Sequence, residues 1–190
     1  MSFYMEKLKA VNIALQALGE YPVSALDTGL PLAGIAQDKV EELNAEQQRL
    51  GWWFNIEQKT FNPDDGNEIN IPSDIVRVFP LYRTNLRVRA GKLFDPEESS
   101  STFKQEVKAT VIRELPWDDL PHSFQKFLAK ESGVELQRAF LGSQKIDQFA
   151  RDERNQAWNQ LYAEELENER YNTNTGTADM LYTVHRKAPW

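Results

Sequence analysis

The chain has no cysteine among its 190 residues and only two histidines, His122 and His185. The missing cysteines exclude disulfides, thiolate nucleophiles, zinc fingers and iron–sulfur clusters. No apolar run approaches the roughly 20 residues of a membrane-spanning helix. The first residues lack the apolar stretch of a secretory signal, and the phosphate-binding patterns GxxxxGK[ST] and GxGxxG are absent. We therefore expect no membrane span, no export by the standard route, and no metal, cofactor or catalytic site.

Negative charge exceeds positive charge along the chain. Asp and Glu number 29, and Lys and Arg number 22, so the formal net charge is −7. Domains whose main role is to bind the phosphates of nucleic acids are usually basic. The charge balance therefore argues against nucleic acid binding as the principal function.

Four stretches show apolar residues at spacings of three and four, which is typical of amphipathic helices. Glycines end three of them, at Gly19, Gly51 and Gly142, where a left-handed residue often follows a helix. The fourth fades in an acidic run. The stretches cover residues 4–18, 32–50, about 118–141 and 146–162. They predict an antiparallel helical bundle of about four helices.

Between the second and third helices, apolar residues alternate with polar ones, as in half-buried strands. The alternation is clear at Ile69–Ile71, Leu86–Ala90 and Val107–Val111, with polar turn segments between them. We expect four to six short antiparallel strands. The predicted fold class is α+β, with a discontinuous helical domain (1–56 and 115–170), a small antiparallel β-sheet inserted at 57–114, and an extended C-terminal tail at 171–190.

Two groups of residues in the first half of the chain are candidates for binding partners. Trp52 and Trp53, with Phe54, cannot all face one way, so at least one is expected to meet a partner element or subunit. Arg87 and Arg89 share a strand face, and Lys92 is close in sequence. These cations form either a docking patch for an acidic partner or phosphates, or the solvated face of an edge strand.

The C-terminal part of the chain offers two further candidates. The acidic run could line a channel through which DNA passes without binding, or it could be a solvated helix end. The last residues could be a docking peptide that orders on a partner, or a frayed terminus. The acidic candidates are Glu164, Glu165, Glu167 and Glu169, and the docking candidates are Leu181, Tyr182 and Trp190.

Two segments together resemble one known family. Residues 10–26 contain Ala-Val-Asn followed by Gly-Glu-x-Pro-Val-Ser, and residues 49–57 contain Gly-Trp-x-Phe-Asn after a helix. This order resembles the tail tubular protein A family, the head-to-tail adaptors of short-tailed phages. Farther on, residues 71–78, 86–95 and 115–143 resemble the family's strand and third-helix segments. The resemblance covers roughly residues 10–172.

The resemblance implies a structural protein of the virion tail, assembled in the host cytoplasm. In this family a dodecameric ring lies beneath the portal protein at one capsid vertex. On its other side the ring meets the tail nozzle, of the tubular protein B type, and tail fibres or spikes attach near that junction. Genomic DNA passes through the central hole during ejection, without sequence-specific binding.

Two functions of other classes remain open from the residues. Some phage tail components are cell-wall or polysaccharide hydrolases, and the chain has 29 carboxylates, although the sequence singles out no pair of them. A DNA-binding assembly factor is the other alternative, against which the acidic charge counts.

Overall fold

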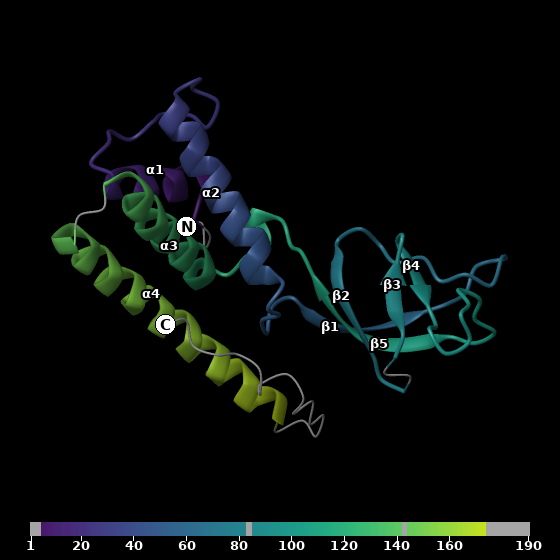
Figure 1. Cartoon of the computed structure of the whole chain (residues 1–190). Coiled ribbons are helices and arrows are strands. Elements are labelled where there is room, and N and C mark those ends of the chain that lie inside the picture. Colours follow the sequence, from purple (N-terminus) through teal and green to yellow (C-terminus); the bar gives the residue numbers. More distant parts are fainter. Residues whose placement is uncertain (1–4, 83–84, 142–143, 174–190) are drawn as a thin grey trace. The chain divides into compact units, whose positions relative to one another are not determined.

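The computed structural model describes residues 5–82, 85–141 and 144–173, with the side chains of residues 144–147 and 169–173 outside this description (Figure 1). The chain divides into two compact units. The helical unit contains the chain up to Glu46 and from Pro116 onward, and the strand unit is Gln47–Leu115. Helices and antiparallel strands occupy separate parts of the sequence, so the predicted α+β class is confirmed.

Four long helices dominate the described part of the chain, together with a short 3-10 turn at Trp117–Asp119. The last two residues of the second helix already belong to the strand unit. The four helices are α1 (Lys7–Ala17), α2 (Pro31–Gln48), α3 (His122–Phe140) and α4 (Gln144–Thr173). Each lies close to a stretch predicted from apolar spacing.

Helix α4 continues farther than the sequence predicts, because it runs through the acidic run to Thr173. Glutamate, leucine and alanine are good helix formers, and their propensity outweighs the unfavourable charge near the helix end. The first three residues of the predicted C-terminal tail are therefore helical. The rest of that tail, 174–190, lies outside the described residues.

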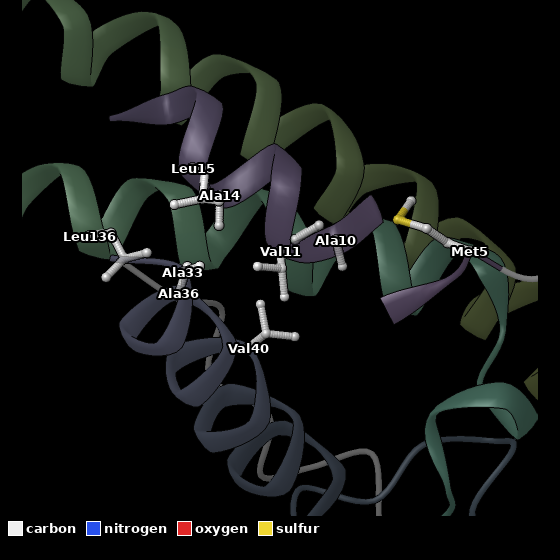
Figure 2. Close-up of a cluster of buried hydrophobic side chains, with 10 residues drawn as sticks. Met5, Ala10, Val11, Ala14, Leu15, Ala33, Ala36, Val40 and Leu136 are labelled. Carbon is white, nitrogen blue, oxygen red and sulfur yellow. The ribbon is translucent and has the colours of Figure 1, made fainter. Parts of the chain in front are cut away.

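Small side chains allow α1, α2 and α3 to pack closely in the helical unit. The core cluster contains alanines from each of these helices, with Val11, Leu15, Val40 and Leu136 among them (Figure 2). At Gly133, α3 comes close to α1, because a Cβ atom there would lie 2.9 Å from the Cβ of Ala17. Side chains larger than hydrogen at position 133 therefore push α1 and α3 apart.

Pairs of contacting residues show how the helices run relative to one another. Lys130 contacts Glu153 and Lys126 contacts Gln160, so residue numbers rise along α3 as they fall along α4. These two helices form an antiparallel hairpin, and they lie side by side in Figure 1. Along α1 the numbers rise in the same direction as along α3, since Met5 contacts Gln125 and Ala17 approaches Gly133.

An amide side chain holds the connection between α1 and α2. Gly19 ends α1 with a φ of 81°, in the left-handed region that glycine accepts without strain. Asn12 then donates a hydrogen bond to the carbonyl of Val23 at 2.9 Å and accepts one from its N–H at 2.8 Å. Asn12, Gly19 and Val23 all belong to the motif that carries the family resemblance, and all three shape this connection.

The strand unit contains five strands among the described residues. A three-stranded antiparallel sheet has the order β1-β5-β2, and β3 and β4 form a separate hairpin. The strands are β1 (Ile56–Phe61), β2 (Ile75–Pro80), β3 (Arg87–Arg89), β4 (Lys92–Phe94) and β5 (Val107–Arg113). The number falls within the predicted four to six.

The individual strands agree only in part with the alternation in the sequence. The predicted strands at Leu86–Ala90 and Val107–Val111 correspond to β3 and β5. Ile69–Ile71 is not a strand, although both isoleucines are buried, because this stretch pairs only through the isolated bridge of Asn70 with Lys92. β5 is central in its sheet and is buried on both faces from Ala109 to Ile112, so simple alternation does not describe it.

Candidate interaction surfaces

A short joint connects the end of α2 with the first strand of the strand unit. Gly51 has a φ of 79°, and a Cβ atom there would lie only 2.7 Å from the Cδ1 atom of Ile112. Both features call for glycine, because a side chain would be strained in the left-handed region and crowded by the isoleucine. The glycine of the Gly-Trp-x-Phe-Asn motif therefore has a structural role.

The first tryptophan after this glycine is part of the core. Trp52 has 0% of its surface exposed, and its indole N–H donates to the carbonyl of Gln47 at 2.8 Å. Trp53, which is half-buried, meets it edge to face with ring centroids 6.4 Å apart. Trp52 therefore packs inside the strand unit and presents no exposed ring to a partner, whereas Trp53 still reaches the surface. Fully buried aromatic side chains contribute to packing rather than to recognition.

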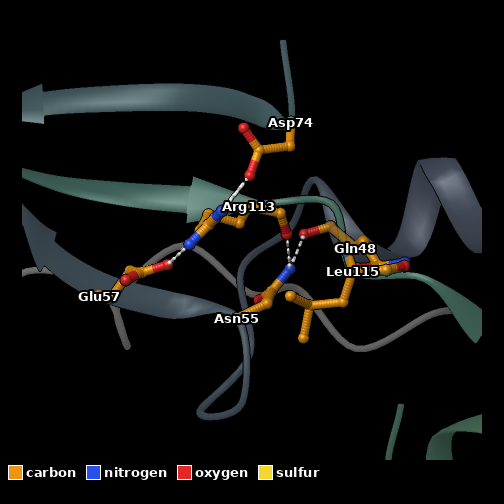
Figure 3. A network of polar contacts seen from close by, with 6 residues as sticks. All are labelled: Gln48, Asn55, Glu57, Asp74, Arg113 and Leu115. Carbon is orange, nitrogen blue, oxygen red and sulfur yellow. Dashed lines mark hydrogen bonds and ion pairs between the residues drawn. The ribbon is translucent and has the colours of Figure 1, made fainter. Parts of the chain in front are cut away.

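The asparagine of the same motif joins three backbone segments. Asn55 accepts a hydrogen bond from the N–H of Trp52 at 2.7 Å and donates to the carbonyls of Gln48 and Arg113. Gln48 pairs with both the N–H and the carbonyl of Leu115, at 2.7 and 3.1 Å. Figure 3 shows this network, in which buried amides join the chain segment before the first strand to the segment at the end of the last strand.

An arginine beside this network binds two carboxylates. Arg113 donates to Asp74 through Nε at 2.8 Å and to Glu57 at 2.9 Å (Figure 3). The hydrogen bond from Arg113 is the largest effect that lowers the pKa of Asp74 below its ordinary value. This charged group links β1, β5 and the segment before β2, so it ties together parts of the strand unit.

The predicted basic patch lies on the β3–β4 hairpin. Arg87 and Arg89 are both exposed on β3, and the guanidinium of Arg89 lies 4.0 Å from the ring centre of Phe94. Lys92 is half-buried and pairs with Glu68, which raises its pKa. The two arginines therefore remain available to a partner, whereas the charge of Lys92 is already matched within the chain.

The predicted acidic residues whose side chains the structure describes lie in different environments on α4. Successive residues on a helix point about 100° apart. Glu165 is buried with 3% exposure, and Glu164 accepts a hydrogen bond from the hydroxyl of Ser123. Glu167 is exposed, and the side chain of Glu169 lies outside the described part. Of the four, Glu165 is thus corrected from a surface residue to a buried residue of α4.

The three aromatic and apolar candidates near the C-terminus lie outside the described residues. Leu181, Tyr182 and Trp190 all follow Thr173, at which the last helix ends. Their proposed role in docking remains a prediction from the sequence.

A groove on the helical unit was not anticipated from the sequence. It has a volume of about 330 Å³ and lies among α1, α3 and α4. Gln137 and Phe149 both line it, and the ring of Phe149 is 75% exposed. Apolar spacing gave no signal for this site, because Gln137 is polar in the sequence but only 1% exposed in the structure.

None of the helices in the described part of the chain combines the length and the apolar character that a membrane crossing requires. Among the same residues, no group of three or more His, Asp or Glu side chains is arranged to hold a metal ion.

Comparison with known proteins places these features in a family. Residues 8–171 match the model of a family described as tail tubular protein, a range that covers the strands described above and nearly all of the four helices. The chain is also 26% identical over 170 residues to tail tubular protein A of Klebsiella phage KP34, covering 89% of this chain and 91% of that protein. A structural component of a phage tail is therefore the class to which the fold and its surfaces correspond. The chain belongs to the tail tubular protein family.

Proposed function

We propose that the chain is a head-to-tail adaptor, which forms a ring between the portal and the tail nozzle of a short-tailed phage. The observation that carries this proposal is the family match over residues 8–171, supported by the similarity to a protein named tail tubular protein A. The proposed ring is dodecameric, and the genome leaves the capsid through its centre. A closed ring requires each subunit to carry two unlike surfaces that fit each other.

The two units suggest a division of labour within the adaptor. In this proposal the helical unit builds the wall of the ring, and the strand unit projects toward the nozzle, the fibres or the spikes. The exposed arginines of β3, Arg87 and Arg89, supply a cationic contact for an acidic partner. The net charge of −7 and the exposed Glu167 favour release of DNA, because like charges weaken its binding.

The proposal is tested by measuring molar mass with light scattering during size exclusion. The chain is run by itself, the portal of the same phage by itself, and then the two together. Twelve copies of a 22.0 kDa chain add about 260 kDa to the portal. A mass increase of this size supports both the portal contact and the closed ring. If the chain elutes separately from the portal at every concentration tested, the adaptor function is wrong.

A further inference from the structure

The β3–β4 hairpin reverses within two residues, which fixes the direction of its main-chain groups. Ala90 and Gly91 have φ values of 48° and 74°, and two consecutive left-handed residues are typical of a type I′ turn. In such a hairpin the residues that flank the turn, Arg89 and Lys92, exchange both of their main-chain hydrogen bonds. The next pair, Val88 with Leu93, is therefore a non-hydrogen-bonded pair, whose N–H and carbonyl groups point away from the opposite strand.

The other side of β4 confirms this alternation. The N–H of Leu93 donates to the carbonyl of Ile69 at 2.9 Å, and Asn70 forms a bridge with Lys92. The main-chain groups of Leu93 thus point away from β3, and those of Val88 point away from β4. Within the described part of the chain β3 pairs with no strand other than β4, and all three of its residues are exposed. β3 therefore presents an open edge, with the N–H and the carbonyl of Val88 directed outward.

The two faces of β3 carry different side chains. Because side chains alternate along a strand and pair across it, Val88 shares a face with Leu86 and Leu93. Both leucines are buried in the core cluster of the strand unit, whereas Val88 is 44% exposed. The apolar face of the hairpin therefore continues to its edge and is left partly uncovered there.

The opposite face of β3 is cationic. Arg87 and Arg89 are both exposed on it, and Arg89 lies over the uncharged ring of Phe94. The ion pairs in the described part of the strand unit use other cations, namely Lys92, Lys108 and Arg113. The positive charge of this face is therefore available to carboxylates from outside the chain.

These features together define the segment that would fit. A strand added beside β3 places one residue opposite Val88, on the apolar face, and its two neighbours on the face of Arg87 and Arg89. Opposite charges in such cross-strand pairs are stabilising, and like charges are destabilising. The matching segment is extended and has the order acidic, apolar, acidic.

A second copy of this chain does not supply such a segment. Pairing two β3 strands would set arginine against arginine, which is unfavourable. The sequence contains one run of the order acidic, apolar, acidic, at Glu165–Glu167. That run lies within the helix α4, where Glu165 is buried. The charges and the residue order therefore favour a different protein.

We infer that the open edge of β3 binds an extended acidic segment of another protein by strand addition. The main chain of that segment bonds to Val88, and its acidic side chains pair with Arg87 and Arg89. The inference rests on the proposed function in taking the strand unit as a partner-binding surface, and it adds the conformation and residue order of the partner. It does not depend on the number of subunits in a ring.

The first experiment titrates the full chain, labelled with nitrogen-15, with the blocked peptide Ser-Thr-Glu-Val-Glu-Thr-Ser. The control peptide, Ser-Thr-Val-Glu-Glu-Thr-Ser, has the same composition and charge but lacks the alternation. For so short an edge we expect a dissociation constant on the order of 1 mM. At about 5 mM peptide roughly five sixths of the chain is then bound, so hydrogen exchange at the amide of Val88 slows about sixfold.

The control peptide should bind about tenfold more weakly, because its adjacent glutamates face opposite sides of a strand. Equal effects of the two peptides, changes at residues away from β3, or no change at Val88 up to about 10 mM would each overturn the inference. Exchange at Val88 that slows with the concentration of the chain itself, without peptide, would show that a second copy occupies the edge and would also overturn it.

The second experiment removes the outward N–H. Val88→Pro lacks this donor, and proline is tolerated on edge strands where the N–H faces outward. Val88→Thr is the matched control, because it keeps the N–H and a β-branched side chain. We expect Val88→Pro to weaken binding of the alternating peptide more than tenfold and Val88→Thr to bind nearly as the wild type does. If a folded Val88→Pro binds as tightly as Val88→Thr, strand addition is wrong. If Val88→Pro does not fold, the exchange measurement on the wild type decides.

This inference and the proposed function fail in different ways. If the portal gains about 260 kDa but the alternating peptide leaves Val88 unchanged, the adaptor function stands and strand addition is wrong. If the peptide protects Val88 but the portal gains no mass, strand addition stands and the adaptor function is wrong.

Discussion

At the scale of single residues, the motifs that carry the family resemblance have structural roles. Asn12 holds Val23, Gly51 fits against Ile112, and Asn55 joins three backbone segments. Such positions explain why short motifs indicate a fold: each one satisfies a geometric requirement that few other residues meet.

Replacing the glycine of the joint should destabilise the protein. Gly51→Ala places a Cβ atom in the left-handed region and against Ile112, and we expect a loss of about 1–3 kcal/mol in the free energy of unfolding. Gly34→Ala is the matched control, because a Cβ atom at that helical position meets nothing within 4 Å. Denaturant unfolding of both variants measures the difference. Equal stability of the two variants would contradict the role given to Gly51.

A buried carboxylate should give the helical unit a distinctive pH dependence. Burial is the largest effect on Glu131 and raises its pKa above the ordinary value of 4.5, although Arg154 lies 3.2 Å away and opposes the shift. The folded state therefore binds a proton at higher pH than the unfolded state. Stability from this group is lost as pH rises through the folded pKa, and is regained as pH falls toward 4.5.

The comparison that isolates this effect is with Glu131→Gln, which cannot titrate. Between neutral pH and about pH 4.5, we expect the wild-type chain to gain stability relative to the variant as the solution is acidified. Unfolding in denaturant at several pH values measures the difference between the two chains. A difference that stays constant, or that changes in the opposite direction, would show that the pKa of Glu131 is not raised.

At the scale of elements, the β3–β4 hairpin carries the clearest cationic surface. Arg87 and Arg89 are exposed, so reversing their charge should leave the fold intact. If the strand unit meets an acidic nozzle or fibre protein, Arg87→Glu with Arg89→Glu should weaken that binding by about tenfold or more, most at low salt. Titration calorimetry against the purified nozzle protein measures the effect.

A pair of exposed lysines elsewhere in the strand unit provides the control. Lys104→Glu with Lys108→Glu makes the same change in net charge on a different segment. We expect this variant to bind the nozzle protein nearly as well as the wild type. Equal weakening by both double variants would mean that overall charge matters and that the hairpin is not a specific contact.

At the scale of the whole molecule, the net charge of −7 bears on the proposed channel. If the chain forms the proposed ring, the channel has to release the genome without binding its phosphates, and an acidic protein favours release through repulsion. We expect the chain to leave the mobility of duplex DNA unchanged in a gel at physiological salt. A shift that disappears as salt is raised would instead revive the alternative of a DNA-binding assembly factor.

The extent to which the sequence predicts the structure differs from one element to another. The helices could be predicted because spacings of three and four, ended by glycines such as Gly19, report local geometry that depends on few distant contacts. β1 and β5 pair across a long stretch of chain, and β1 is mostly polar, so alternation alone did not reveal it. The stretch Ile69–Ile71 shows the opposite error, since buried isoleucines in an irregular segment resemble a strand.

The amino-acid sequence was sufficient for the fold class, the approximate helices and the family, because these depend on spacing, composition and short motifs. Only the tertiary structure decided which side chains face outward. It buried Trp52 and Glu165, left Arg87 exposed, and brought Gln137 and Phe149 to one groove. The physical reason is that exposure depends on contacts between residues far apart in the chain, and no local pattern specifies which distant residue covers a given side chain.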